Sequence, residues 1–550
     1  MQRNAVNPFH IPIVLDEIAP LLSLKDLRQC ILVSRTFWSA FVPYAWRNVH
    51  FVSLTLQESH DLADFNSPFL LASSRTPAER REFYQHSVQS IKLAAALPFW
   101  YRSSSYGLSP TLSCFPNLTQ FNFRNQKFIR TDDRLHEEAT VIMPAVLTFL
   151  QAHTSLTAVD LSFLQVGPDF VDQLQITMEH LSSLRSLVLT LYGELSLLDH
   201  LHILEIGQRL EKFHLSTGSS LCAFSKSSNT ELEQYNQRMD TIQADGCMIK
   251  DLYIDIGHFE IVMADYLKKC PLLERLIIRT LSTVHSAVYM KLAEAMRENC
   301  PRLKHLELKA PQMSEFDQAN IIAACCPSTK QDIRPGLYSL KTRFSGAPVS
   351  IALDAILGHN STLTSLSICQ GKGVSGPGLH QIVTSCVHLR SLAARVVFMD
   401  TIPIAMEVIE GEPWRCRSLC TLSLYFSDFC TSPGRLPASM FLNNLYVQVG
   451  TLNLLEVLSF RVGRAGWVPT RQLFLDGIVQ FHNLKRLRRF GFHKEEASVL
   501  KKRHVKIMLE QWPRLEQLAG LLEDFRAYGL AQWLMRKRPD LDLSEFNDGM

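Results

Sequence analysis

The chain has 550 residues, of which 46% are hydrophobic and 20% charged, so it can bury a large core and global disorder is excluded. The 56 Lys and Arg residues nearly balance the 53 Asp and Glu residues, and the formal net charge of +3 excludes a chain that coats nucleic acid. Domains usually have roughly 100–200 residues, so the length indicates several domains or one array of repeats.

The N-terminal residues do not form a signal peptide, because Asp16 and Glu17 interrupt their apolar stretch. No apolar run reaches the roughly 18 residues that are needed to cross a bilayer, and the best one, from Leu93 to Trp100, contains Pro98. The thirteen cysteines are scattered without a C-x-x-C pair, as expected for buried thiols in a reducing compartment. We therefore expect a cytoplasmic or nuclear protein without membrane contact.

Residues 7–51 predict three short helices that precede a repeating pattern. Ser23 and Asp26 are spaced as a capping box for the second helix, and Ser34 can cap a third helix that carries Phe37 and Phe41. Three such helices bury too little surface to be stable alone, so we expect part of their apolar face to meet another chain. The alternative is a helical cap on the following repeats, and the two interpretations are compatible.

A repeat dominates the chain from about residue 85 onward. The pattern L-x-x-L-x-L, with conservative replacements, recurs fifteen times at an average spacing of about 30 residues. The middle apolar residues of the copies are Ile91, Phe121, Val159, Leu187, Phe213, Leu252, Leu276, Leu306, Leu340, Leu366, Leu392, Leu422, Leu458, Phe490 and Leu518.

The spacing inside each copy favours a strand, because its last two apolar positions lie on one side of an extended chain and do not share a helix face with the first. Segments with helical spacing precede many copies, and Cys-Pro closes several of them, as at Cys300-Pro301. Each repeat therefore predicts one parallel strand and one helix. Thr342, Ala394 and Gly520 occupy positions where a large apolar residue is expected, and an all-helical array is the structural alternative.

Three stretches interrupt the regular spacing. Residues 99–114, 216–247 and 427–440 are polar or rich in Gly, Ser and Pro, and we expect them to form loops. Loops on one rim of a repeat array often supply binding contacts, although most are simply solvated.

The other motifs in the sequence give little indication of catalysis, cofactor binding or metal binding. Residues 371–376 match G-x-G-x-x-G, but every strand–loop–helix unit of a repeat shares that layout, and the acidic residue expected about 20 positions later is missing. His200 and His202 lack further metal ligands, and the basic residues near Lys485 and Lys501 are interpreted as a solvated face. We expect no catalytic residue, cofactor or metal; a nucleotide-dependent enzyme built on the Gly371 loop is the third hypothesis.

The repeat pattern resembles the irregular leucine-rich repeats that are attached to F-box proteins, and residues 7–51 resemble the F-box itself. The matching elements are Pro12 in an I-P motif, L-K-D-L at Leu24 to Leu27, C-I-L-V-S-R at Cys30 to Arg35, and Trp46-Arg47, whereas Phe37 stands where tryptophan is usual. The resemblance implies an α/β fold: a small N-terminal three-helix F-box, then a leucine-rich-repeat solenoid with parallel strands on its concave face and helices on its convex face.

The expected domains are an F-box at 7–51, a connection at 52–84, the solenoid at 85–535 and a tail at 536–550. By resemblance, the chain is a non-enzymatic adaptor that recruits a protein substrate to a Skp–cullin–F-box ubiquitin ligase; the alternative is a leucine-rich-repeat interaction scaffold outside ubiquitination. The expected partners are a Skp-type linker, through it a cullin, and a protein substrate, without nucleic acid or membrane. The resemblance implies these residues for contact with the linker: Pro12, Ile13, Ile18, Leu22, Leu24, Leu27 and Val33.

The strand interpretation also predicts which residues line the concave face. Residues that flank the middle apolar position should point away from the helices, because side chains alternate along a strand. The candidates for substrate contact are Lys212, His214, Asp251, Tyr253, Arg275, His305 and Glu307. Their mixed charge suits a protein partner better than an extended polyanion.

Overall fold

The computed structural model describes residues 15, 17–51, 86–94, 115–124, 146–165, 169–192, 195–217, 229–241, 246–255, 262–279, 286–310, 313–327, 335–344, 350–371, 373–397, 412–427, 438–462, 478–492, 500–522 and 527–544. The chain divides into two compact units, Met1–Ile254 and Asp255–Met550, which are described in turn. None of the helices in these described ranges is long and apolar enough to span a bilayer.

Unit 1 begins with a helical module that consists of η2 (Ala19–Leu21), α2 (Leu24–Ile31) and α3 (Arg35–Arg47). The amide of Asp26 donates to Ser23 Oγ at 3.2 Å, and the amide of Phe37 donates to Ser34 Oγ at 3.2 Å. Both serines therefore satisfy amides of a first helical turn that have no partner inside the helix. The two predicted caps of α2 and α3 are confirmed.

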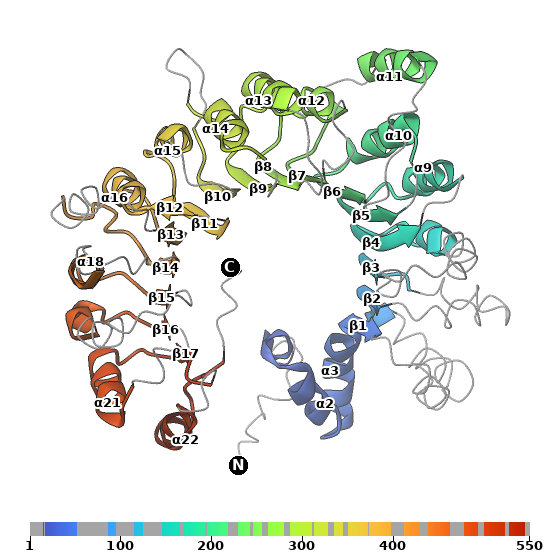
Figure 1. The fold of residues 1–550 in the computed structure, drawn as a ribbon. Helices are drawn as coiled ribbons and strands as arrows, with labels where there is room; N and C mark the ends of the chain where they lie inside the picture. The colour runs from blue at the N-terminus through green and yellow to red at the C-terminus, as the bar shows by residue number, and fades with distance from the viewer. Residues whose placement is uncertain are drawn as a thin grey trace, which may run out of the picture. The chain divides into compact units, whose positions relative to one another are not determined.

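The rest of unit 1 alternates strands with helices (Figure 1). The strands are β1 (Asn48–Phe51), β2 (Ser90–Ala94), β3 (Gln120–Arg124), β4 (Ala158–Gln165), β5 (Ser186–Tyr192), β6 (Lys212–Thr217) and β7 (Asp251–Asp255), whose last residue lies at the boundary of the units. The helices between them are α9 (Phe170–His180), α10 (Leu197–Gly207) and α11 (Asn229–Thr241). The pairings from β1 to β7 are all parallel and follow chain order.

Unit 2 continues the same alternation. Its strands are β8 (Arg275–Arg279), β9 (His305–Lys309), β10 (Ser339–Phe344), β11 (Ser365–Gly371), β12 (Val374–Ser375), β13 (Ser391–Val397), β14 (Thr421–Ser427), β15 (Val457–Val462), β16 (Arg489–Gly491) and β17 (Gln517–Ala519). Its helices are α12 (Val262–Leu267), α13 (Ser286–Asn299), α14 (Glu315–Ala324), α15 (Ser350–Leu357), α16 (Gly376–Ser385), α18 (Ala438–Gly450), η6 (Phe481–Asn483), α21 (Lys502–Gln511) and α22 (Tyr528–Lys537). In each unit the helices lie along one side of the strand layer (Figure 1).

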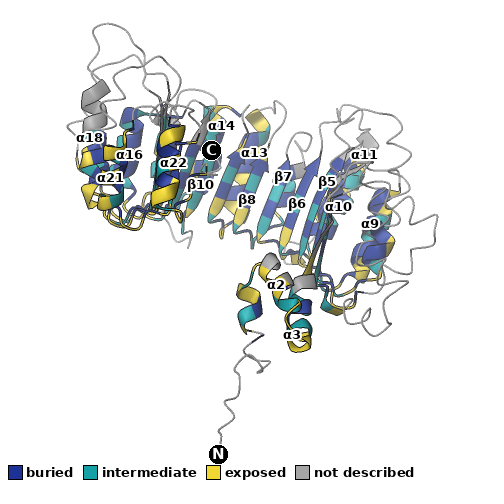
Figure 2. Cartoon of the chain, turned by 90° about the horizontal axis from the view of Figure 1, so that it is seen from below, coloured by how far each residue is buried: buried dark blue, intermediate teal, exposed yellow. Residues whose placement is uncertain are grey.

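The strand register confirms the predicted repeat. In unit 1, Ile91 pairs with Phe121, and the pairing continues through Val159, Leu187 and Phe213 to Leu252. In unit 2 the row runs from Leu276 to Leu518 through the middle residue of every predicted copy. All fifteen side chains are buried, and Figure 2 shows the buried residues as bands along the strands and the inner sides of the helices. The fold is the expected α/β leucine-rich-repeat solenoid.

The three departures from the apolar pattern have local reasons. Thr342 is buried, but its hydroxyl donates to Gln318 Oε1 at 2.6 Å, so its polar atom has a partner. Gly520 has φ +104°, and a Cβ there would lie 2.2 Å from the carbonyl oxygen of Phe492. A larger residue at this position would collide with the neighbouring repeat. Ala394 is fully buried, so its site is filled without a large side chain.

The polar stretch between residues 216 and 247 was expected to form a loop, and this expectation is wrong for Asn229–Thr241, which form α11. Tyr235 and Met239, four residues apart, are buried, and this single stripe is enough to attach an otherwise polar helix. Arg238 strengthens the attachment through two contacts of 2.9 and 3.0 Å with Glu205 on α10. In the last expected loop, α18 begins at Ala438, whereas residues 99–114 lie outside the described residues.

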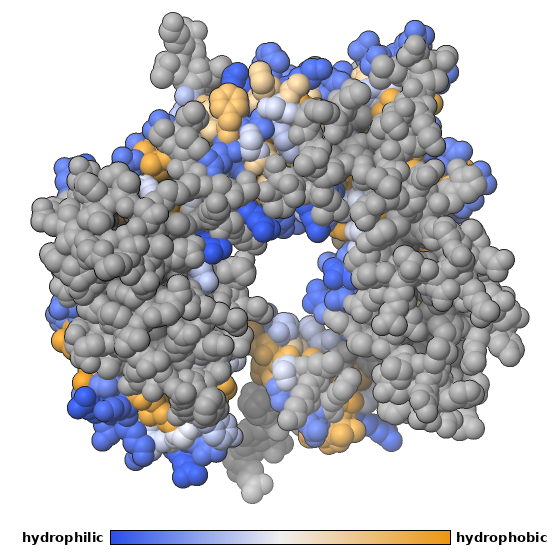
Figure 3. All heavy atoms as spheres, in the orientation of Figure 1, coloured by the Kyte–Doolittle hydropathy of each residue, from blue (hydrophilic) through white to orange (hydrophobic). Residues whose placement is uncertain are grey.

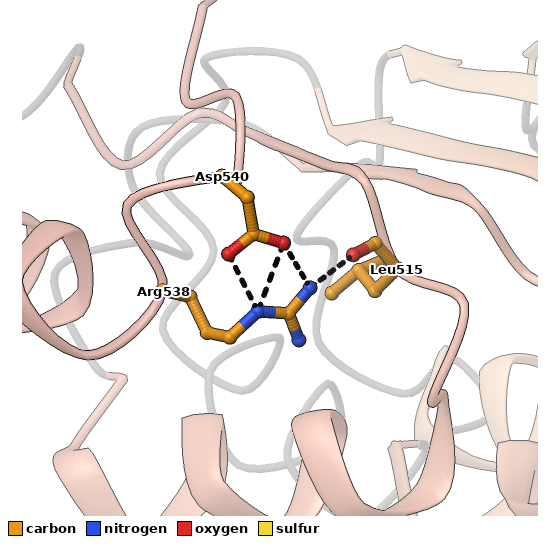
Figure 4. A network of polar contacts seen from close by, with 3 residues as sticks. All are labelled: Leu515, Arg538 and Asp540. Atoms are coloured by element: carbon orange, nitrogen blue, oxygen red, sulfur yellow. Dashed lines mark hydrogen bonds and ion pairs between the residues drawn. The ribbon is translucent and has the colours of Figure 1, made fainter. Parts of the chain in front are cut away.

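The C-terminal residues complete the last repeat. Arg538 donates from Nε and Nη2 to the carboxylate of Asp540 and from Nη2 to the carbonyl oxygen of Leu515 at 3.2 Å (Figure 4). Asp542 forms a parallel bridge with Gln517 of β17, and Leu541 and Leu543 are buried. The ordered packing therefore extends to Ser544, and α22 crosses residue 535, where the sequence predicted the solenoid to end.

Candidate functional site

The helical module has a core of its own. Leu15, Ala19, Leu27 and Phe41 are its buried residues, and Leu22, Ile31 and Phe37 pack against them. The rings of Phe37 and Phe41 meet edge to face, with centroids 5.4 Å apart. The module therefore buries part of its apolar surface in its own core. Leu27, which is 5% exposed, belongs to that core.

Other large apolar side chains of the module stay exposed. Leu21, at the end of η2, is 83% exposed, whereas Leu32 and Val33, directly after α2, are 80% and 68% exposed. Apolar side chains gather on the helical module in Figure 3, and Figure 2 shows many exposed residues on α2 and α3. Large apolar side chains that stay exposed on a small module are candidates for contact with a partner. We call Leu21, Leu32 and Val33 the exposed triad.

The predicted linker-contact residues fall into different environments. Val33 belongs to the exposed triad, Ile18 is half-buried, and Leu22 and Leu27 pack in the core of the module. The side chain of Leu24 and all of Pro12 and Ile13 lie outside the described residues. The sequence analysis missed Leu21 and Leu32. The Leu21-Leu22 pair was a usable signal, because two adjacent helical residues cannot both face one core.

The second candidate surface is the open face of the strand layer, which we define as the strand residues whose side chains point away from the helices. In unit 1, Lys212 and His214 on β6 pair in register with Asp251 and Tyr253 on β7. Lys212 Nζ lies 3.8 Å from the Asp251 carboxylate, and the ring centroids of His214 and Tyr253 are 3.6 Å apart. The structure thus brings these four predicted residues together.

A second polar cluster on the open face of unit 1 was not predicted. Asp160 on β4 accepts from Asn122 Nδ2 at 2.6 Å and from Arg124 Nη2 at 3.2 Å, both on β3. Ser162 donates to the other oxygen of the same carboxylate. The cluster follows from side-chain alternation once β3 and β4 are placed side by side, and sequence alone did not set their register.

The open face of unit 2 carries the remaining predicted residues. Arg275 on β8 pairs with His305 on β9, and Glu307 lies two residues further along β9. The Glu307 carboxylate is 3.3 Å from both Lys309 Nζ and Lys341 Nζ. The side chain of Glu307 is only 14% exposed, while those of the two lysines are 43% and 41% exposed. The carboxylate therefore lies at the base of the surface and the ammonium groups lie above it.

The glycine-rich loop at 371–376 has a structural role in packing. Gly373 has φ +77°, and a Cβ there would lie 1.9 Å from the carbonyl oxygen of Arg395 on β13. Ser375 Oγ accepts from the amide of Gly378 and caps α16. The backbone of the neighbouring repeat thus occupies the space beside Gly373 that a phosphate cradle needs.

Buried histidine and cysteine side chains serve the core. His359 Nδ1 accepts from the amide of Leu337 at 3.1 Å, so Nε2 carries the hydrogen and points to the carbonyl oxygen of Ile322 at 3.1 Å. Neither ring nitrogen is left to deprotonate Cys326, whose Sγ lies 3.4 Å from Nε2. Burial lowers the pKa of His359 and raises the pKa of Cys326, which keeps both groups neutral.

Burial also keeps two further thiols in their neutral, protonated form. Burial raises the pKa of Cys386 to about 11 and that of Cys416 to about 12. His200, singled out in the sequence, is buried with its Nδ1 2.7 Å from the carbonyl oxygen of Ser196. Within the described ranges, no three His, Cys, Asp or Glu residues are grouped so that they could hold a metal ion.

Comparisons with known proteins find similarity only to solved structures of low sequence identity. No protein-family model and no curated protein matches the chain. A chain of the TLR13–ssRNA13 complex is 12% identical with a TM-score of 0.34, and the match covers 84% of this chain and 62% of that one. A chain of the Rad7 and Elc1 complex in yeast is 11% identical with a TM-score of 0.34, covering 85% and 93%. The present chain thus spans less than two thirds of the TLR13 chain.

Proposed function

We propose that the chain is a non-catalytic adaptor that recruits a protein substrate to a Skp–cullin–F-box ubiquitin ligase. In this proposal the helical module binds a Skp-type linker protein, which connects to a cullin, and the open face of the strands binds the substrate. The F-box resemblance of residues 7–51 suggests the linker. The repeat fold supplies a broad surface of strand side chains that point away from the helices.

The observation that carries the proposal is the contrast between the core of the module and its exposed triad. Leu27 and Phe41 are 5% and 2% exposed, so the module folds around its own core, yet Leu21 is 83% exposed. Burying a fully exposed side chain of this size contributes about 1.5–3 kcal/mol. Covering the exposed triad would therefore contribute favourable free energy to the binding of a partner.

The mechanism is bridging, and no covalent bond is made or broken by this chain. A linker held at the helical module and a substrate held at the open face become parts of one assembly. The substrate then meets the charged conjugating enzyme at an effective concentration that reaches the millimolar range for short connections. Proximity alone accelerates a transfer that would otherwise require a bimolecular encounter.

The second candidate is a leucine-rich-repeat scaffold in which the helical module only caps the sheet. One observation favours it: α3 runs directly into β1, and β1 pairs with β2 as the first strand of unit 1. The module is therefore continuous with the edge of the sheet. A cap does not need the exposed triad, and this distinguishes the two candidates.

The test replaces the exposed triad with Leu21→Glu, Leu32→Glu and Val33→Glu in the full chain. We expect co-purification with a co-expressed Skp-type protein to fall at least tenfold, because three carboxylates would enter an apolar interface. The matched control is Gln29→Glu, Thr36→Glu and Ser39→Glu, which adds the same charge at exposed polar positions on α2 and α3 of the same module. Equal melting temperatures of both variants and the parent chain would show that folding is unaffected.

Two results would contradict the proposal. The parent chain could fail to capture any Skp-type protein, or the triad variant could capture it as well as the control does. Either result would leave the scaffold as the better description of the chain.

A further inference from the structure

The two helices α21 and α22 of unit 2 carry a group of exposed cations. Lys502, Arg503 and Lys506 lie on α21, Arg536 and Lys537 lie on α22, and all five side chains are exposed. Lys502 Nζ lies 5.8 Å from the centroid of the Trp533 ring, so a direct contact joins the two helices. We call the five cations the basic end face. Figure 3 shows strongly hydrophilic residues, with a few apolar ones among them, at the lower left, where α21 and α22 lie in Figure 1.

The charge of this face is not cancelled by neighbouring carboxylates. In the part of the chain that the structure describes, none of the five cations forms an ion pair. Glu510 is the one carboxylate on α21 and α22, and both helices are described in full. Asp540, in the turn after α22, is held by Arg538 at 2.8 Å. The five cations therefore keep their charge available to a partner.

The sequence around the two helices lowers this positive charge without removing it. Residues 493–499 and 523–526, which lie outside the described residues, add four acidic and two basic residues. Residues 493–540 as a whole contain ten Lys and Arg and seven Asp and Glu. The excess of cations thus persists when every charge of this part of the chain is counted.

A histidine beside the face reports the local potential. Burial and the charges of Arg503 and Lys501 lower the pKa of His504 on α21. The imidazole is therefore neutral at pH 7, and the neighbouring cations resist the addition of another positive charge. This effect is expected where the local potential is positive.

Exposed apolar side chains accompany the cations. Tyr528 and Met535 on α22 are 54% and 42% exposed, and they lie seven residues apart, on the same side of the helix. Leu530 and Leu534 of the same helix are buried, so the exposed pair lies away from the core. Ile507, on α21 next to Lys506, is also exposed. The surface thus combines unpaired cations with apolar groups that no other repeat covers.

This combination fits a bilayer that contains anionic lipids. Such a bilayer offers negative headgroups to Lys and Arg, and an apolar layer directly beneath them to side chains such as Tyr and Met. A nucleic-acid duplex has no such layer, so Tyr528 and Met535 would lie against charged phosphates. A second copy of the chain would present the same positive charge and be repelled. A folded acidic protein would need apolar residues at matching positions, whereas lipids rearrange around any pattern.

We propose that the basic end face binds membrane surfaces that contain anionic lipids, with its cations at the headgroups and Tyr528 and Met535 at the boundary of the acyl region. The inference goes beyond the proposed function, because neither the linker nor the substrate takes part. The sequence analysis expected no membrane contact and interpreted the cations near Lys501 as a solvated face. Contact with the surface of a bilayer requires no spanning segment, and each cation near an anionic surface raises partitioning about fivefold.

The experiment measures co-sedimentation of the full chain with vesicles of phosphatidylcholine that contain about 30% phosphatidylserine. We expect binding that weakens with salt and that falls at least tenfold in the variant Lys506→Gln, Arg536→Gln, Lys537→Gln. The matched control neutralises three exposed cations on α13 and in the turn after it, Lys291→Gln, Arg297→Gln and Arg302→Gln, and should bind within twofold of the parent chain.

A second variant tests the apolar part of the contact. Tyr528→Ala with Met535→Ala leaves every charge in place and should weaken vesicle binding severalfold, because less apolar surface would enter the bilayer. Melting temperatures equal to that of the parent chain would show that both variants fold normally.

Several outcomes would overturn the inference. They are no binding of the parent chain to the anionic vesicles, equal binding to vesicles of phosphatidylcholine alone, an equal loss in the α13 control, or no loss in the Tyr528 and Met535 variant. Tighter binding of a DNA duplex or of a Glu-rich peptide, lost in the cation variant, would reassign the face to that partner. Capture of the Skp-type protein is measured in parallel. The cation variant should keep this capture, while the triad variant should lose it and still bind vesicles, so the two proposals fail separately.

Discussion

The two units share one strand geometry but use charge differently on their open faces. In unit 1, Arg124 contacts Asp160 and Lys212 contacts Asp251, so cations meet carboxylates on the neighbouring strand. On β9 and β10 of unit 2, Lys309 and Lys341 share the Glu307 carboxylate, at 3.3 Å each. In unit 1 each of the two carboxylates thus contacts a cation of a neighbouring strand, whereas in unit 2 one largely covered carboxylate lies between two lysines.

The largest expected effect comes from breaking the scaffold beneath one face only. Leu306→Ala in β9 and Leu187→Ala in β5 each remove a buried side chain and should each lower the free energy of unfolding by about 2–5 kcal/mol, measured by urea unfolding. Because repeats contact mainly their neighbours, hydrogen exchange should rise only in the unit that carries the change.

A loss below about 0.5 kcal/mol for Leu306→Ala would contradict the burial of the middle apolar positions. Equal loosening of both units by either variant would show that their stabilities are coupled.

A smaller effect is expected where the backbone at Gly373 comes close to the neighbouring strand β13. Gly373→Ala places a Cβ at φ +77° against the carbonyl oxygen of Arg395, so β13 must shift. We expect a loss of about 1–3 kcal/mol, seen as a lower melting temperature. Gly529→Ala in α22 is the matched control, because its Cβ would have no atom within 4 Å. If both variants melted at the same temperature, the close approach of Gly373 to β13 would be refuted.

The smallest effect sharpens the contrast between the two faces. Asp160→Asn with Asp251→Asn removes the carboxylates paired with Arg124 and Lys212. Partly exposed pairs contribute little, so the loss of stability should stay below about 1 kcal/mol per pair. The loss is measured by urea unfolding beside the parent chain. A loss well above about 1 kcal/mol per pair would show that these ion pairs contribute more stability than their partial exposure indicates.

The sequence predicted the fold well because the leucine pattern is also the packing pattern. Ile91 through Leu518 form one buried position per strand, and this position depends only on which residues are apolar and how they are spaced. The pattern could not reveal β1, because NVHF contains no leucine repeat and becomes a strand by pairing with β2. It also missed α11, where Tyr235 and Met239 are the buried residues among the side chains that the structure describes and gave too weak a period.

The candidate site was less predictable. Alternation placed Lys212, Asp251 and Glu307 on the open face, but their ion pairs depend on the register of strands that are more than 30 residues apart in the chain. In the helical module, the amphipathic pattern identified the apolar residues but did not show which of them are buried in the core. Leu27 went to the core and Leu21 to the surface. The role of the predicted linker and substrate contacts stays a prediction.

The residues after α22 have a consequence for the behaviour of the protein at high concentration. An uncovered outer strand offers its amides and carbonyls to any other extended chain and invites aggregation. At β17 the bridge from Asp542 to Gln517 occupies part of that edge, and Arg538 fastens the turn that leads to it. The residues after α22 therefore leave fewer free backbone groups on β17 for pairing with a strand of another molecule.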